Sequence, residues 1–160
     1  MNRGYRKIKT WHVLHDTTKM KEKRKKYKMT TYGEYEFVVR KVYSASAIKR
    51  AHEIKITRRQ VLNIIKKLSK RYFKDENKVW VWWLSKDELW NTGGVLFDDE
   101  RQPVIELINT KKNLRVGIVL HEFAHAFAGH KYGIINHGKI FIKTFNKVLR
   151  FYYTQTKKNS

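Results

Sequence analysis

Hydrophobic residues cover almost the whole circumference of one predicted helix, which the pattern places at about residues 114–129. A helix that is apolar on all sides is typical of a protein interior. After Arg115, its only polar side chains are His121, Glu122 and His125. Charged groups are rarely buried without compensation, so the pattern predicts a function for these three residues.

Two further helices follow from periodicity. Thr57 and Gln60 have the spacing of a capping box, and apolar residues then recur at helical intervals as far as Tyr72. The opposite side of that helix is basic. A last helix begins near Gly138 and also has a basic outer face. Its apolar stripe is Phe141, Phe145, Val148, Leu149 and Tyr152.

Short runs of β-branched and aromatic residues predict the strands. We expect a strand or short hairpin at residues 31–43, and strands at 78–84, 95–97 and 104–108. Residues 91–94 and 98–100 are typical of turns. Strands interspersed with helices in this order indicate an α+β fold with a small mixed sheet.

The chain has 160 residues, enough for one compact domain with a core. We expect a basic, flexible arm at residues 1–30, a single domain at 31–153 and a frayed polar tail at 154–160. We also expect a monomer.

The formal net charge of +22 predicts attraction to a polyanion, with nucleic acid, and DNA in particular, as the expected partner. An alternative is that the lysines only solvate the surface. The candidate contacts lie on the predicted helix near residues 57–72 and in the arm. They are Arg59, Lys66, Lys67, Lys70, Lys23, Arg24, Lys25 and Lys26.

The chain has no cysteine, which excludes disulfides and cysteine-based zinc ribbons and fits a reducing compartment. Its N-terminus lacks the apolar run of a signal peptide, and no apolar stretch approaches membrane-spanning length. We therefore expect an intracellular protein that is neither secreted nor bound to a membrane.

The two histidines of the buried helix are four residues apart, so they stack on one helical face and can bind one Zn²⁺ ion together. Glu122 lies between them and can act as general base on a metal-bound water. A catalytic zinc site needs a third protein ligand. His130 and His137 both lie downstream, and His137 is favoured because a short helix–loop–helix returns it to the first helix.

These motifs together resemble a known family. The run Val119 to Ala126, followed by His137-Gly138-x-x-Phe141, is similar to the SprT-like zinc metallopeptidases, which include Spartan and the WLM proteases. The resemblance covers about residues 57–153. One departure is Lys139, where the family often has proline. Another is the lack of the DNA-binding modules that follow the protease core in some members. A core without such modules is compatible with a phage or mobile-element protein.

The resemblance implies a minimal zincin fold in which His121, His125 and His137 bind zinc and Glu122 is the catalytic acid/base. It implies cleavage of DNA-associated proteins. Residues 104–108 resemble the family's edge strand, so Ile105, Glu106 and Leu107 are expected to bind an extended peptide by strand addition. Tyr132 lies between the candidate ligands in the sequence and could stabilise the oxyanion, although a packing role is favoured.

Two other functions are compatible with the same residues. One is a nucleic-acid-binding protein in which the zinc is structural. The other is a virion or assembly protein that uses the core as a scaffold or maturation protease. A structural site has no need of a buried base, so Glu122 favours the peptidase.

Overall fold

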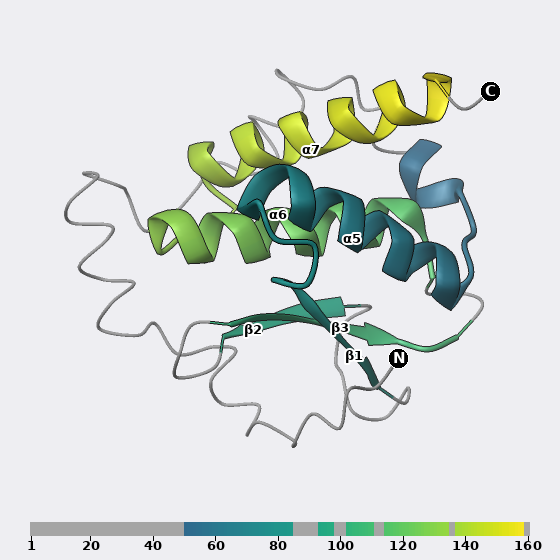
Figure 1. Cartoon of the computed structure of the whole chain (residues 1–160), viewed down its shortest axis with the longest axis horizontal. Coiled ribbons are helices and arrows are strands. Elements are labelled where there is room, and N and C mark those ends of the chain that lie inside the picture. Colours follow the sequence, from purple (N-terminus) through teal and green to yellow (C-terminus); the bar gives the residue numbers. More distant parts are fainter. Residues whose placement is uncertain (1–49, 85–92, 98–101, 111–113, 135–136, 159–160) are drawn as a thin grey trace.

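The computed structural model describes residues 50–84, 93–97, 102–110, 114–134 and 137–158. After a short helical turn at residues 50–53, they form three helices and three strands. In chain order these are α5 (Arg58–Phe73), β1 (Trp80–Leu84), β2 (Gly93–Phe97), β3 (Pro103–Ile108), α6 (Val116–Tyr132) and α7 (Lys139–Lys158). The helices lie together on one side of the sheet (Figure 1). The predicted α+β class is confirmed.

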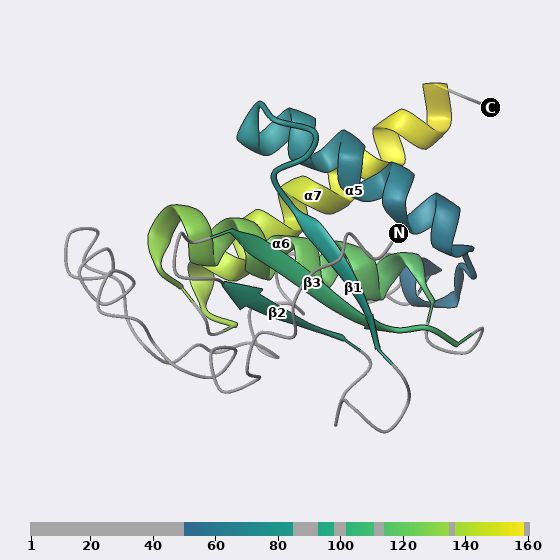
Figure 2. The same cartoon turned by 60° about the horizontal axis from the view of Figure 1, so that its bottom comes forward.

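The sheet is mixed, and β3 is its central strand. The strand order is β1-β3-β2, with β1 parallel and β2 antiparallel to β3. Figure 2 shows β3 between the other two strands. The register places Trp82 of β1 and Gly94 of β2 on either side of Glu106.

The prediction that residues 104–108 form an edge strand is therefore wrong. A peptide can add only to a strand with an unpaired edge, and β3 is paired on both sides. Ile105, Glu106 and Leu107 are each 0% exposed. These three residues have neither the free backbone nor the surface that peptide binding requires.

α6 is the central helix of the fold. It packs against α5, α7, β2 and β3, which explains why its sequence is apolar on all sides. The main core lies between the helices and the inner face of the sheet, where Ile105 and Leu107 contribute. A smaller cluster covers the other face of the sheet: Trp82, Leu84, Leu96 and Val104.

α6 continues one turn beyond the predicted end at residue 129. Gly133 then adopts a left-handed conformation with φ 70°. The Gly133 N–H donates to the Gly129 carbonyl at 3.0 Å, and the Ile134 N–H donates to the Ala128 carbonyl at 3.3 Å. This is the geometry of a glycine-terminated helix. His130 consequently lies within the helix, one residue beyond the predicted end.

α5 and α7 also lie where the sequence pattern predicts helices. At the start of α5 the Thr57 N–H donates to Gln60 Oε1 at 2.8 Å, and the Gln60 N–H donates to Thr57 Oγ1 at 3.2 Å. α7 runs to Lys158, so the prediction of a frayed tail from residue 154 is wrong for residues 154–158. Packing of the preceding aromatic residues on the core extends the helix.

The predicted turn at residues 91–94 is also wrong in part, because Gly93 and Gly94 belong to β2. Glu106 Oε2 lies 3.7 Å from the position that a Cβ on Gly94 would occupy, so the buried carboxyl packs beside this glycine. The predicted arm (1–30), hairpin (31–43) and turn (98–100) lie outside the described residues. The division into arm, domain and tail thus remains a prediction. None of the described helices is long and apolar enough to cross a membrane.

The contact between α6 and β2 depends on a glycine. A Cβ on Gly129 would lie 2.4 Å from the tip of the Phe97 ring. We expect Gly129→Ala to lower the free energy of unfolding by about 1–3 kcal/mol, because the displaced ring outweighs the higher helix propensity of alanine. Denaturant unfolding measures the change. The exposed Lys147→Ala is the control, and an equal or greater stability of Gly129→Ala would contradict the packing argument.

Candidate metal centre

α6 supplies two of the candidate ligands. His121 and His125 are separated by one helical turn, so both rings leave the same face of the helix. This face packs against α7. Both side chains are only partly accessible, although the helix around them is buried.

His137 comes from the segment that leads into α7. It is followed by Gly138, whose carbonyl accepts the Ile142 N–H at 3.1 Å as the helix begins. The packing of α7 on α6 brings the three rings together, as the sequence pattern predicts. Their Nε2 atoms form a nearly equilateral triangle, with separations of 3.1 Å (His121–His125), 2.9 Å (His125–His137) and 3.1 Å (His121–His137).

Mutual hydrogen bonding cannot explain this triangle. Each Nε2 carries either one hydrogen or one lone pair in its ring plane, so it makes one good hydrogen bond and not two. Nitrogens bound to one tetrahedral zinc ion at about 2.05 Å lie about 3.3 Å apart. The observed separations are close to that value. Three neutral imidazoles suit zinc, copper, iron or nickel and are poor ligands for Mg²⁺ or Ca²⁺.

Phe141 positions all three rings. It stacks on His125 with a centroid distance of 4.2 Å and an interplanar angle of 27°. Its ring also lies 5.0 Å from that of His121 and 4.9 Å from that of His137. Phe145 adds a second contact to His121 at 5.7 Å. The sequence pattern predicts Phe141 as a core residue and does not show this second role.

Burial keeps the three histidines neutral. Together with smaller contributions from the neighbouring His137 and His52, it lowers the pKa of His121 from 6.5 to about 3. The pKa of His125 is lowered in the same way, by burial and by the other two histidines. Burial also lowers the pKa of His137. A neutral imidazole has the lone pair that a metal ligand needs, so the site is ready to bind a cation.

Glu122 is buried on the same helix, with 8% of its surface exposed. Burial, with a smaller contribution from the carboxyl of Glu106, raises its pKa from 4.5 to about 8. Without a cation this carboxyl is therefore largely protonated at neutral pH. A divalent cation at the three neighbouring nitrogens would favour the ionised carboxylate.

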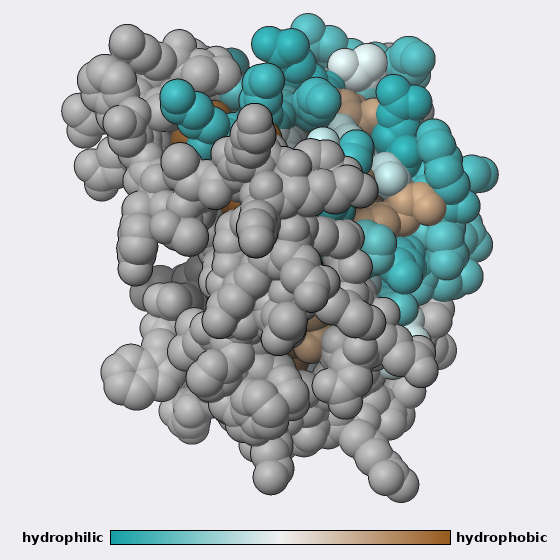
Figure 3. Space-filling model, turned by 90° about the vertical axis from the view of Figure 1, so that its left-hand side faces the viewer, coloured by the Kyte–Doolittle hydropathy of each residue, from teal (hydrophilic) through white to brown (hydrophobic). Residues whose placement is uncertain are grey.

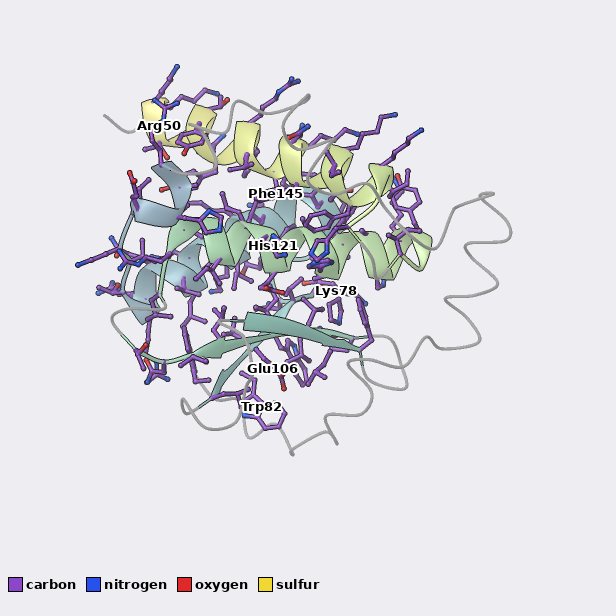
Figure 4. The ribbon with its side chains drawn as sticks, turned by 180° about the vertical axis from the view of Figure 1, so that it is seen from behind. Arg50, Lys78, Trp82, Glu106, His121 and Phe145 are labelled. Atoms are coloured by element: carbon purple, nitrogen blue, oxygen red, sulfur yellow. The ribbon has the colours of Figure 1, made fainter. Side chains whose placement is uncertain are left out.

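Glu106 lies apart from the histidines. Residues alternate between the two faces of a strand, so Glu106 shares the outer face of β3 with Val104. Figure 4 shows Glu106 and Trp82 on one side of the sheet, and His121 and Phe145 on the other. The charge of Glu106 contributes to the raised pKa of Glu122.

His52 is a fourth histidine near the centre that sequence analysis did not single out. A Cβ on Gly117 would lie 2.3 Å from its Nδ1, so the ring packs directly against the α6 backbone. Gly117 precedes His121 by one turn, and His52 contributes to the lowered pKa of His121. A glycine within the predicted helix was the available signal, because such a glycine often marks a close contact.

The structure places the remaining candidates elsewhere. His130 packs against Phe73 of α5 with ring centroids 5.2 Å apart, and it is not one of the three grouped histidines. Tyr132 packs against Phe127 at 6.4 Å. The basic residues Arg59, Lys66, Lys67 and Lys70 are exposed on α5 and contribute nothing to the centre. The arm residues 23–26 lie outside the described part of the chain.

No family model, curated protein or solved structure matches the chain. The description of a possible metal-binding site thus rests on the three histidines and on the geometry that brings them together.

We expect purified protein from metal-replete medium to contain about one transition-metal ion per chain. His121→Ala, His125→Ala and His137→Ala should each reduce this to traces, because two nitrogens leave the ion half coordinated. Elemental analysis after gel filtration measures the content. His130→Ala is the matched control and should keep the ion. Full metal content in His137→Ala would exclude His137 from the ligand set.

The raised pKa of Glu122 predicts a pH dependence in metal-free protein. Between pH 4.5 and about 8 the folded state holds a proton on Glu122 that the unfolded state has lost, so this group lowers stability as pH rises. Glu122→Gln removes the effect. In EDTA the variant should therefore gain stability over wild type with rising pH, reaching on the order of a few kcal/mol at pH 8.

Thermal unfolding of both proteins at several pH values measures this difference. The histidines are common to both proteins, so their titration cancels in the comparison. A difference that stays constant between pH 5 and 8 would show that the Glu122 pKa is not raised by folding.

Proposed function

We propose that this chain is a zinc-dependent metalloendopeptidase of SprT-like type. The observation that carries the proposal is the triangle of Nε2 atoms from His121, His125 and His137, with the buried Glu122 next to the first of them. Three protein ligands leave one position open, as catalytic zinc sites require. The resemblance of these motifs to the SprT-like family supports the same assignment.

The protein residues would act as follows. The three imidazoles hold the ion, and Phe141 fixes the planes of their rings. A bound zinc ion would supply a Lewis acid that polarises the scissile carbonyl and makes a water more acidic. The Glu122 carboxylate accepts a proton at one oxygen as the water attacks. It then donates that proton to the nitrogen of the leaving amine.

β2 is the better candidate for pairing with an extended peptide. Among the described strands it lies at one edge of the sheet, and it packs against α6. A peptide added to this edge would run beside the helix that carries His121 and His125. The proposed substrate is protein associated with nucleic acid, and the net charge of +22 supports that choice.

A structural zinc site in a nucleic-acid-binding protein is the alternative. Structural zinc is almost always held by four protein ligands. The described residues group only three, all of them histidines. A buried glutamate beside the ion also has no role in holding a structural zinc. These two features favour catalysis.

We expect Glu122→Gln to keep its zinc and to lose peptidase activity by about 10²- to 10⁴-fold, because it removes the proton acceptor and leaves the ligands in place. The assay measures cleavage of casein and of a histone, each with and without DNA. Zinc content is measured on the same preparations.

His130→Ala again serves as control and should cleave at the wild-type rate. The peptidase assignment fails if zinc-loaded wild type cleaves neither substrate, or if Glu122→Gln cleaves as fast as wild type. Zinc retained without any cleavage would indicate the structural alternative.

A further inference from the structure

A groove with a volume of about 290 Å³ runs between α5 and α7, and no part of it belongs to the metal centre. Its floor is apolar: Ile64 and Leu68 from α5, Phe151 and Tyr152 from α7. Lys67 and Gln155 stand at its rim. Phe151 and Tyr152 are both partly exposed, so each ring presents some of its surface to the groove.

The two helices that form this groove carry twelve basic residues and no acidic one. All twelve side chains are exposed. They are Arg58, Arg59, Lys66, Lys67, Lys70 and Arg71 on α5, and Lys139, Lys143, Lys147, Arg150, Lys157 and Lys158 on α7. In Figure 3, hydrophilic side chains cover the described upper part of the molecule, where the helices lie, with a few hydrophobic ones between them.

This distribution is unfavourable for the protein alone. Like charges four residues apart on a helix destabilise it, and Lys66–Lys70, Lys67–Arg71 and Lys143–Lys147 are such pairs. A surface that only needed solvation would mix both signs of charge. A bound polyanion removes the repulsion, so the single sign of charge indicates a polyanionic partner.

The aromatic residues indicate what kind of polyanion. The Arg71 guanidinium lies over the Phe151 ring, 6.0 Å from its centroid. Tyr72 contacts Phe151 edge-on at 6.3 Å, and Tyr153 contacts Tyr152 at 5.4 Å. Single-strand binding proteins combine a cationic groove that follows the backbone with aromatic rings on which bases stack. A duplex keeps its bases stacked inside and offers only phosphates to such a groove.

We propose that the groove between α5 and α7 binds single-stranded nucleic acid. Bases lie against Phe151 and Tyr152, and the phosphates contact the basic residues of both helices. An acidic polypeptide would match the charge but would make no use of the partly exposed rings. The site is separate from the metal centre and does not rest on the proposed peptidase activity.

The test measures binding of a fluorescently labelled oligothymidylate to the full chain by anisotropy, over a series of salt concentrations. Tyr152→Leu keeps the apolar floor and removes the stacking surface, so it should weaken binding by about tenfold. The salt dependence should not change, because no phosphate contact is lost. Lys67→Glu should weaken binding and also reduce the slope of log K against log salt concentration by about one.

Two matched control variants distinguish binding in this groove from non-specific electrostatic attraction of the oligonucleotide to the basic protein. Lys55→Glu makes the same change of charge at an exposed position outside both helices and should weaken binding by less than threefold. Tyr132→Leu removes an aromatic ring from α6 and should have no effect. Gln155→Glu places a negative charge at the rim and tests the groove independently should Tyr152→Leu fail to fold.

Several results would overturn the proposal. Equal effects of Lys67→Glu and Lys55→Glu would show that only net charge matters. Equal affinity for a duplex of the same length would show contacts to phosphates alone, and equal competition by polyglutamate would indicate an acidic protein partner. Unchanged binding in both Tyr152→Leu and Gln155→Glu would place the nucleic acid elsewhere, for example on residues 1–30. Each readout is independent of zinc content and of cleavage.

Discussion

The structure depends on the burial of α6 on all sides. Two helices, α5 and α7, and two strands, β2 and β3, surround it so closely that its polar side chains have little access to water. Isolated charges in such surroundings are costly, which holds His121 and His125 in their neutral forms and Glu122 in its protonated form. The site is thus a set of uncharged nitrogen ligands with an adjacent carboxyl. A bound cation would accept the lone pairs of the three nitrogens and stabilise the ionised form of the carboxyl.

Aromatic packing gives this set of ligands its geometry. His137 lies just before α7 and Phe141 lies in its first turn, so the third candidate ligand and the ring that supports it are close together in the chain. The same phenylalanine contacts His121 and His125 across the helix interface. Docking of α7 on α6 and assembly of the three nitrogens are therefore one event. We infer that apolar packing preorganises the site before an ion binds.

In contrast to the uncharged interior, the outer surface of the helices is strongly charged. α5 and α7 turn their apolar sides inward and leave only positive charge outside, with a shallow apolar groove where they meet. The candidate metal centre lies between α6 and α7, whereas the groove lies between α5 and α7. The candidate metal centre and the proposed binding groove are therefore separate features of one small fold.

Local pattern was sufficient for much of the molecule. The capping box of Thr57 and Gln60, the helical spacing of His121 and His125, and the stripe beginning at Phe141 all depend on residues a few positions apart. Their geometry follows from the pitch of a helix whatever surrounds it. The preference for His137 over His130 as third ligand could also be predicted from the sequence. A short connection between antiparallel helices limits where the chain can return.

Tertiary structure decided what depends on distant partners. Residues 104–108 read as a strand from their composition, but whether a strand is central or at an edge depends on which other strands pair with it. The packing of His52 on Gly117 and the groove beside Tyr152 likewise join segments far apart in sequence. The sequence by itself thus determined the three candidate ligands and the helices that bring them together. Only the packing of those helices and strands decided which surfaces are left for a substrate or a partner, because pairing and burial are properties of two elements and not of one.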